Sequence, residues 1–349
     1  MAGYSEFSFT SLWARIGGKA DQALKATGNA PRGVLVALPE AERAALAAQI
    51  TPHLDALEGV RLQTLATVDS RARLLVPLAG GGAFLALLAG GQGMTAAVIF
   101  GLIAAVVGWF IAMGNRSGQY QAMVKTRFAT VTSAHLSGFD HVVEPETDLA
   151  HLRGWHLFPD LQSARTSDRI KGQRGGRSLS LSEMSIAYAP GKRDRSDHVL
   201  SCSVVEVASG AVDGAMLVLT PKDAPPRILV SQHKAADLIA ASTGDAAFDA
   251  VYSLRTSDPG TTHLLTPELR TAILALDDVA PAGRPYLVFL PGYLAVLFPT
   301  TFADLAFHVP PYWIRIDAEA LLAQFASDLA RKNSLINAVL RLPDLPRSE

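Results

Sequence analysis

The chain has 349 residues, of which 49% are hydrophobic, and a formal net charge of −1. This length accommodates two domains, or one domain with anchoring segments. The charge balance argues against a surface built to hold nucleic acid, and the single cysteine, Cys202, excludes an intramolecular disulfide and a thiolate-cluster metal site. We therefore expect no nucleic-acid partner.

Residues 1–73 are predicted to form a helical segment that starts without a signal peptide. The sequence MAGYSEFSFTSLWARIGGK places Glu6 before its first base and has no uninterrupted apolar core. Two helices are expected, LPEAERAALAAQI and TPHLDALEGVRLQTLATVDSRA, each with proline at its first helical position and the second capped by Thr51. The second helix carries one apolar stripe, formed by Leu54, Leu57, Leu65 and Val68.

A run of 41 residues, at positions 74–114, contains no Asp, Glu, Lys, Arg or His. One crossing of a bilayer needs about 20 apolar residues, so the run is long enough for two crossings joined by a turn. The GGQG stretch at residues 90–93 supplies that turn, because glycine tolerates positive φ angles and the glutamine is polar. We predict transmembrane helices over residues 74–89 and 94–113, and Pro77 leaves open a kink or an incomplete crossing in the first.

Basic residues lie at only one end of this hairpin. Arg71 and Arg73 precede it, and Arg116, Lys125 and Arg127 follow it, whereas the turn has none. The positive-inside rule therefore predicts that both termini face the cytoplasm.

The hairpin has the features of an anchor. Ionisable groups at membrane depth usually mark an ion path or a substrate site, and this segment has none. Small residues, including Gly101 and Gly108, allow the two helices to pack closely, and packing between copies of the chain stays open. The alternative is a buried helical hairpin in a large soluble core, but soluble helices usually need a polar face.

A helix near the membrane is predicted over residues 115–137. Its apolar stripe recurs at intervals of three or four, as Tyr120, Val124, Phe128, Val131 and His135. This stripe and the one upstream of the hairpin leave the membrane on the same side. They either pack together as a short cytoplasmic stalk or pack separately on the following domain.

Residues 138–342 are predicted to form a cytoplasmic α+β domain with largely antiparallel strands, followed by a tail at residues 343–349. The predicted strands are MSIAYA, VLSCSVVEVA, AMLVLT, RILVSQ, FDAVYSLRT, PYLVFL and YLAVLF, and the last two form a hairpin around Pro291 and Gly292. Two helices interrupt them: LLTPELRTAILAL with Thr266 as N-cap, and DAEALLAQFASDLARKNSLINAVLRL with Asp317 as N-cap.

The most suggestive functional stretch is RTSDRIKGQRGGR, whose bases surround a glycine turn. Backbone amides exposed at glycines, together with several bases, can hold phosphate, although the stretch lacks the spacing of a P-loop. It is either a solvated loop or a contact for anionic lipid headgroups or another phosphate. The candidate residues are Arg165, Arg169, Lys171, Arg174 and Arg177.

Other reactive side chains do not form a recognisable catalytic or metal-binding set. His151 and His156 are five residues apart and have no HExxH-like partner. Cys202 is expected to be buried and inert in a strand, and the acidic pair Asp277 and Asp278 suits the end of a helix. We expect no catalytic residue, no metal and no cofactor.

Several features, taken in order, resemble a bacterial membrane family catalogued as domain of unknown function 3137 (DUF 3137). They are the two spans, KGQRGGRSLSLSE, and then FDAVYSLRTSDPGTTHLLTPELRTAILAL with a strand hairpin. The likeness covers roughly residues 114–342 and is most specific over residues 248–276. It departs at VDGAMLVL, where a bulkier aromatic-glycine strand is expected.

The resemblance implies a two-span protein of the bacterial inner membrane with a cytoplasmic domain. It brings no established reaction, cofactor or catalytic residue. The motif residues Gly172, Glu183, Pro267 and Glu268 are expected to hold the fold.

The sequence therefore predicts a membrane-anchored interaction or scaffold domain without catalytic activity, with the lipid bilayer as partner and a protein partner or self-association through the hairpin left open. Two alternatives remain. One is a membrane-bound enzyme or ligand-binding protein for a phosphorylated or lipidic substrate, and the other is an accessory subunit of a transport or envelope complex.

Overall fold

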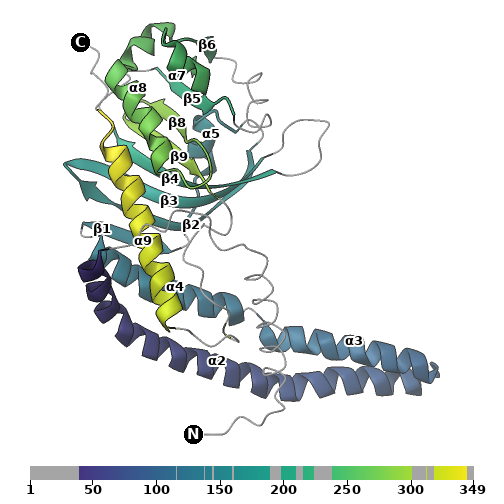
Figure 1. Cartoon of the computed structure of the whole chain (residues 1–349). Coiled ribbons are helices and arrows are strands. Elements are labelled where there is room, and N and C mark those ends of the chain that lie inside the picture. Colours follow the sequence, from purple (N-terminus) through teal and green to yellow (C-terminus); the bar gives the residue numbers. More distant parts are fainter. Residues whose placement is uncertain are drawn as a thin grey trace. The chain divides into compact units, whose positions relative to one another are not determined.

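The computed structural model describes residues 39–114, 116–136, 138–143, 145–158, 161–188, 198–209, 215–223, 238–300, 312 and 318–343. The described residues form two compact units (Figure 1). Of the described residues, the first unit takes those within 41–128, 312 and 318–323, and the second takes 39–40 and those within 129–300 and 324–343.

The first unit is dominated by α2, a single helix of 50 residues over Glu40–Ala89. The predicted helix start at Thr51 is therefore wrong. The Thr51 hydroxyl donates to the carbonyl oxygen of Ala47 at 2.7 Å, one turn back, instead of capping a new helix. Pro52 and Pro77 both lie inside α2, although proline removes a helical hydrogen bond.

The buried face of α2 explains why the helix continues. Its buried residues recur at eleven-residue intervals in two rows, which are Leu46, Leu57 and Val68, and Ile50, Arg61 and Ala72. Eleven residues make three turns of about 3.67 residues, close to the about 3.6 of a straight α-helix. One face therefore stays aligned from Leu46 to Ala72, and a break at Pro52 would turn part of that face away.

Helix α3, over Met94–Met113, follows α2 after the predicted turn and has the predicted bounds. The turn uses a positive φ of 75° at Gly91, and the amide of Gly90 donates to the carbonyl oxygen of Ala86 at 3.0 Å. Both α2 and the helical stretch that begins at Met94 are long and apolar enough to cross a membrane.

Glycines in the seam let the backbones of α2 and α3 approach closely. A Cβ atom on Gly80 would lie 2.9 Å from Cβ of Ala105, and one on Gly108 would lie 2.9 Å from the carbonyl oxygen of Leu75. Earlier residues of α2 thus face later residues of α3, so the helices are antiparallel (Figure 1). The predicted close packing at Gly101 and Gly108 is confirmed, since Gly101 is also buried there.

The rest of the hairpin surface is apolar and exposed. Large hydrophobic side chains cover the sides of α3 that face away from the seam. The exposed ones are Met94, Val98, Ile99, Phe100, Leu102, Ile103, Val106, Val107, Phe110 and Ile111 on α3, with Leu74, Leu78 and Leu85 on α2.

Helix α4 spans Arg116–His135, and most of its predicted stripe is buried. In the first unit, the rings of Tyr120 and Tyr312 meet edge to face with centroids 6.4 Å apart. Arg61 of α2 donates to the carbonyl oxygen of Tyr312 at 3.3 Å and pairs with Glu58 at 2.6 Å. Tyr312 thus contacts both α2 and α4, and whether the two predicted stripes pack together as a stalk stays a prediction.

The second unit is built on an antiparallel nine-stranded sheet with the order β1-β2-β3-β4-β9-β8-β5-β7-β6. The strands are β1 Phe139–Val143, β2 Leu161–Arg174, β3 Arg177–Tyr188, β4 His198–Ala208, β5 Leu217–Pro221, β6 Ile239–Ala241, β7 Tyr252–Thr256, β8 Tyr286–Leu290 and β9 Tyr293–Pro299. The fold is therefore α+β with a large antiparallel sheet, as predicted. The expected hairpin is β8–β9, with Gly292 at φ 84° in its turn.

Several strands differ from the prediction. β1, the whole of β2 and the first half of β3 were missed because their polar residues alternate with few β-branched ones, and the short strand β6 was missed as well. The segment FDAVYSLRT is a strand only from Tyr252, because its first residues belong to helix α7 (Ala246–Val251). The predicted strand RILVSQ lies outside the described residues.

One face of the sheet packs against helix α5 (Leu149–Gly154) and the chain after it. This core includes Leu152, Trp155, Phe158, Met184, Ile186, Cys202, Val204, Met216, Val288 and Leu297. The other face of β2, β3 and β4 is crossed by helix α9 (Ala318–Leu340) (Figure 1). Leu321, Phe325 and Leu329 of α9 are buried as predicted, while its expected N-cap, Asp317, lies outside the described residues.

Short helices fill the connections between β6 and β8. They are α7, the 3-10 helix η2 (Pro259–Leu264), α8 (Pro267–Leu274) and the 3-10 helix η3 (Ala275–Asp278). Thr266 caps α8 as predicted, because its hydroxyl accepts the amide of Leu269 at 3.3 Å.

Candidate functional site

The basic glycine stretch is a β-hairpin, not a solvated loop. Its bases lie on β2 and at the start of β3, and the two strands pair continuously up to Arg174 and Arg177. Gly175 and Gly176 form the turn with φ angles of 60° and 76°, which two-residue hairpins of this type need and which glycine adopts without strain. The turn glycines therefore have a structural reason that involves no ligand.

The sheet divides the five bases between its two faces. Strand residues alternate between faces, and an irregularity in the middle of β2 shifts that alternation. By this register, Arg165, Arg174 and Arg177 lie on the face that α9 crosses, whereas Arg169 and Lys171 lie on the opposite face. The five residues do not converge on one phosphate.

Arg174 and Arg177 hold α9 and the chain after it. The guanidinium of Arg174 donates to the side-chain oxygens of Asn333 at 2.6 Å and Asn337 at 3.1 Å. Arg177 donates to the carbonyl oxygen of Leu342 at 3.4 Å. Both bases are thus engaged within the fold.

The other three bases are more accessible. Arg165 and Lys171 are exposed, and Arg169 is half-buried with its Nε donating to the hydroxyl of Ser182 at 3.1 Å. A contact between these three residues and an anionic headgroup stays a prediction.

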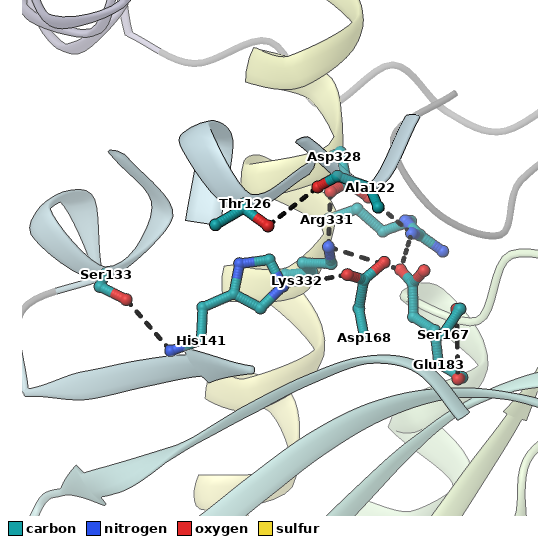
Figure 2. Close-up of polar contacts among 10 residues, drawn as sticks. All are labelled: Ala122, Thr126, Ser133, His141, Ser167, Asp168, Glu183, Asp328, Arg331 and Lys332. Atoms are coloured by element: carbon teal, nitrogen blue, oxygen red, sulfur yellow. Dashed lines mark hydrogen bonds and ion pairs between the residues drawn. The ribbon is translucent and has the colours of Figure 1, made fainter. Parts of the chain in front are cut away.

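The most unusual chemistry of the second unit lies between β3 and α9, where four charged side chains meet in the core (Figure 2). Glu183 has no exposed surface, and Lys332 is 3% exposed. Arg331 contacts Glu183 and Asp328 at 2.7 Å each, and Lys332 contacts Asp328 at 2.6 Å and Glu183 at 3.6 Å. We call these four residues and Asp168 the buried ion cluster.

Asp168 and its partner extend the cluster toward β1. The imidazole Nε2 of His141 lies 3.1 Å from Oδ1 of Asp168, and both side chains are almost fully buried. In Figure 2 the His141 ring, the Lys332 side chain and the Asp168 carboxylate point toward one another. The amide of His141 also donates to the hydroxyl of Ser133 at 3.1 Å, which orients the strand that carries the ring.

The ion pairs decide the charge states in the cluster. Burial alone raises the pKa of Asp328, but Lys332 and Arg331 outweigh it and bring that pKa down to about 2. Burial lowers the pKa of Lys332, and the carboxylates of Asp328, Glu183 and Asp168 more than reverse it, so the net pKa is raised. For Glu183 burial dominates, and its pKa is raised.

The cluster therefore binds α9 to the sheet rather than activating a nucleophile. A catalytic lysine needs a lowered pKa, and that of Lys332 is raised. Asp328, Arg331 and Lys332 sit at positions i, i+3 and i+4 of α9, so they present their charges on the helix face that also buries Leu329. That spacing inside an apolar stripe was the sequence signal for this site, and it was missed.

Other candidate residues also have local structural partners. His151 joins α5 to β4, with Nε2 at 2.5 Å from Oε1 of Glu206, and the backbone of His156 has a positive φ of 54°. Asp277 accepts from Nε of Arg284 at 2.8 Å. Cys202 is buried as predicted, and burial raises the pKa of its thiol to about 12. Within the described ranges, no group of three or more His, Cys, Asp and Glu side chains is placed to hold a metal ion.

Two of the residues on which the resemblance rests have clear structural roles. A Cβ atom on Gly172 would overlap the carbonyl oxygen of Gly138, so only glycine lets the chain before β1 approach β2 this closely. Pro267 occupies the first turn of α8, where a missing amide hydrogen costs nothing. Glu268 follows it in the first turn of α8.

No family model, no curated protein and no solved structure matches this chain.

Proposed function

We propose that this chain is a bacterial inner-membrane protein whose two-helix hairpin anchors an α+β interaction domain at the cytoplasmic face of the membrane. In this proposal the domain binds or organises other proteins and does not catalyse a reaction. The resemblance to DUF 3137 fits the same arrangement of two spans followed by a cytoplasmic domain.

The observation that carries the proposal is the surface of the hairpin. Helix α3 has 20 residues, about 30 Å of helix, which matches the hydrocarbon thickness of a bilayer. Large apolar side chains such as Phe100, Ile103 and Phe110 are more than half exposed. In water such a surface is costly, at about 25 cal/mol for each Å² of apolar area. A bilayer removes that cost.

The orientation is supported by charge. Arg71, Arg73 and Arg116 lie at the end of the hairpin opposite the turn, and the turn has no base. The positive-inside rule places the basic end in the cytoplasm. The second unit follows that end in the sequence, so in this proposal it is cytoplasmic.

The polar groups of the second unit support a non-catalytic domain. The buried ion cluster, the arginines of the β2–β3 turn and the His151–Glu206 pair each join one element of the fold to another. These contacts give Arg174 and Arg177, two of the five bases singled out in the sequence, a role inside the fold. A rigid domain with a fixed surface is suited to binding partners.

The test is affinity purification of the full chain from its own membranes in a mild detergent. We expect a partner protein recovered reproducibly and in fixed stoichiometry, and absent when an unrelated two-span membrane protein is the bait. A chain that is repeatedly recovered alone, from native membranes and after cross-linking, contradicts the interaction role.

A further inference from the structure

The end of the hairpin opposite the turn, called here the basic end, has a defined geometry. Ala72 of α2 packs with Trp109 and Ala112 of α3, so these positions lie at the same level. Arg71 and Arg73 flank Ala72 in sequence, and at about 100° per residue their side chains leave α2 on either side of the seam. Arg116 begins α4 four residues after Ala112, and between them the chain leaves α3 at Gly114 with a φ of 46°. Bases from both α2 and α4 therefore lie near this end of the hairpin.

The net charge at the basic end comes from two of these arginines. Arg73 pairs with Asp69 at 2.7 Å, and Asp69 is almost fully buried, so this pair carries no net charge. Arg71 is exposed and Arg116 is half-buried, with a hydrogen bond to the side chain of Gln119 at 3.2 Å. No acidic residue occurs between Asp69 and Asp140 in the sequence. This stretch therefore contains no carboxylate that could offset the charges of Arg71 and Arg116.

The β2–β3 turn offers a weaker electrostatic site. Arg174 and Arg177 donate to α9 and to the chain that follows it, and the remaining bases of that stretch are split between two faces of the sheet. The bases of the basic end adjoin the apolar surface directly. The uncharged run of residues 74–114 begins directly after Arg73, and Arg116 lies two residues past its end.

We propose that the basic end binds the phosphate headgroups of anionic phospholipids, through Arg71 and Arg116. This inference rests on the proposed membrane anchor and names the lipid that the anchor selects. The hairpin places the two guanidiniums where the apolar surface stops, which is the level of the headgroups when α3 spans the hydrocarbon. Guanidinium groups donate two parallel hydrogen bonds to phosphate oxygens, so arginine suits this contact.

The experiment uses Trp109 as a reporter, because it lies near the basic end and inside the apolar segment. The full chain is reconstituted in phosphatidylcholine vesicles that contain either brominated phosphatidylglycerol or brominated phosphatidylcholine. Bromine quenches tryptophan fluorescence at short range, and the Trp109→Phe variant measures the signal of the other tryptophans. The ratio of quenching by the two lipids gives the preference for the anionic headgroup.

We expect the parent chain to prefer the anionic lipid, and the double variant Arg71→Gln/Arg116→Gln to lose most of that preference. The ratio of quenching by the two lipids should fall about fivefold for each arginine removed. The charge-conserving variant Arg71→Lys/Arg116→Lys should keep most of the preference, which separates loss of charge from loss of folding. The matched control is Arg153→Gln/Lys222→Gln, which removes two exposed bases of the second unit and should match the parent.

Two results would overturn the inference. One is an unchanged preference in Arg71→Gln/Arg116→Gln, and the other is a preference lost in the control Arg153→Gln/Lys222→Gln instead. A different result would overturn the membrane anchor itself: brominated phosphatidylcholine would fail to quench Trp109 in the parent chain. The failure of the lipid inference and the failure of the anchor are thus distinguishable.

Discussion

Lys332 illustrates how a charged residue can be stable in the core of this protein. Its ammonium lies 2.6 Å from Asp328 and 3.6 Å from Glu183, and almost none of it meets solvent. Removing charges from water is costly, so a buried pair contributes little net stability, whereas loss of one partner leaves an unpaired buried charge. The cluster is therefore expected to fix the position of α9 on the sheet, and to contribute little net free energy of folding.

The variant Lys332→Met should lower the free energy of unfolding by about 3–5 kcal/mol, because three carboxylates would remain with one cation. Chemical denaturation of the full chain in mild detergent measures this. The control Lys171→Met removes an exposed lysine from β2 and should change the free energy of unfolding by less than about 0.5 kcal/mol. The double variant Asp328→Leu/Lys332→Met should recover much of the loss. Equal effects of Lys332→Met and Lys171→Met would contradict the role of the cluster.

The pH dependence of stability should carry the signature of Asp328. Its pKa of about 2 lies below the ordinary 3.8, so the folded state binds fewer protons than the unfolded state. The contribution of this carboxylate is therefore complete above about pH 5, roughly one unit above 3.8, and is lost as the pH falls toward about 2. Glu183 acts in the opposite sense, because a raised pKa makes its ionisation unfavourable to folding.

The measurement is the difference in the free energy of unfolding between the parent and Asp328→Asn as a function of pH. The comparison removes only the part of the Glu183 contribution that does not depend on Asp328, because the Asp328 carboxylate helps to raise the pKa of Glu183. We expect a constant difference from pH 7 down to about 5 and a shrinking one below that. A difference that instead grew on acidification would show that Asp328 is not ion-paired in the fold.

At the scale of elements, periodic sequence patterns predicted the structure well. Helix α3 has the expected bounds of Met94–Met113, and α8 begins beside its expected cap, Thr266. The hairpin of β8 and β9 also appears around Pro291 and Gly292. Each of these elements depends on local information, which is a continuous apolar run, a capping residue or a turn pair.

The elements that were missed depend on distant partners. β2 reads as a polar stretch because its outward residues are charged, and only pairing with β1 and β3 makes it a strand. In α2, the local start signal of Thr51 and Pro52, which predicted a new helix, is overridden by a buried face that recurs every eleven residues. The buried ion cluster joins α9 to β2 and β3, residues more than a hundred positions apart, so its members could not be paired from sequence alone.

Gly172→Ala tests how tightly β1 is placed against β2. A Cβ atom there would overlap the backbone of Gly138, so β1 must shift, and we expect a loss of about 1–3 kcal/mol in the free energy of unfolding. Gly154→Ala is the matched control, because a Cβ atom at Gly154 meets nothing within 4 Å. Denaturant unfolding of both variants measures the effect. If the two substitutions were equally tolerated, β1 would not lie as close to β2 as the structure shows.

At the scale of the whole molecule, the two units differ in where their large apolar side chains lie. The hairpin of α2 and α3 exposes large apolar residues, while the nine-stranded sheet encloses its apolar residues between α5 on one face and α9 on the other. This division is the basis for proposing an anchored domain. The proposed partner interactions belong to the second unit, and the proposed lipid selection belongs to the first.

The most direct test of this account is the sidedness of the hairpin turn. In a Cys202→Ala background, single cysteines are placed at Gln92 in the turn and at Gln119 on α4, both of them exposed. Intact cells of a bacterial host are then treated with a maleimide that cannot cross the inner membrane. We expect Gln92→Cys to react in intact cells and Gln119→Cys to react only after the inner membrane is broken. Labelling of Gln119→Cys in intact cells, or protection of both positions until lysis, would contradict a two-span anchor with a cytoplasmic domain.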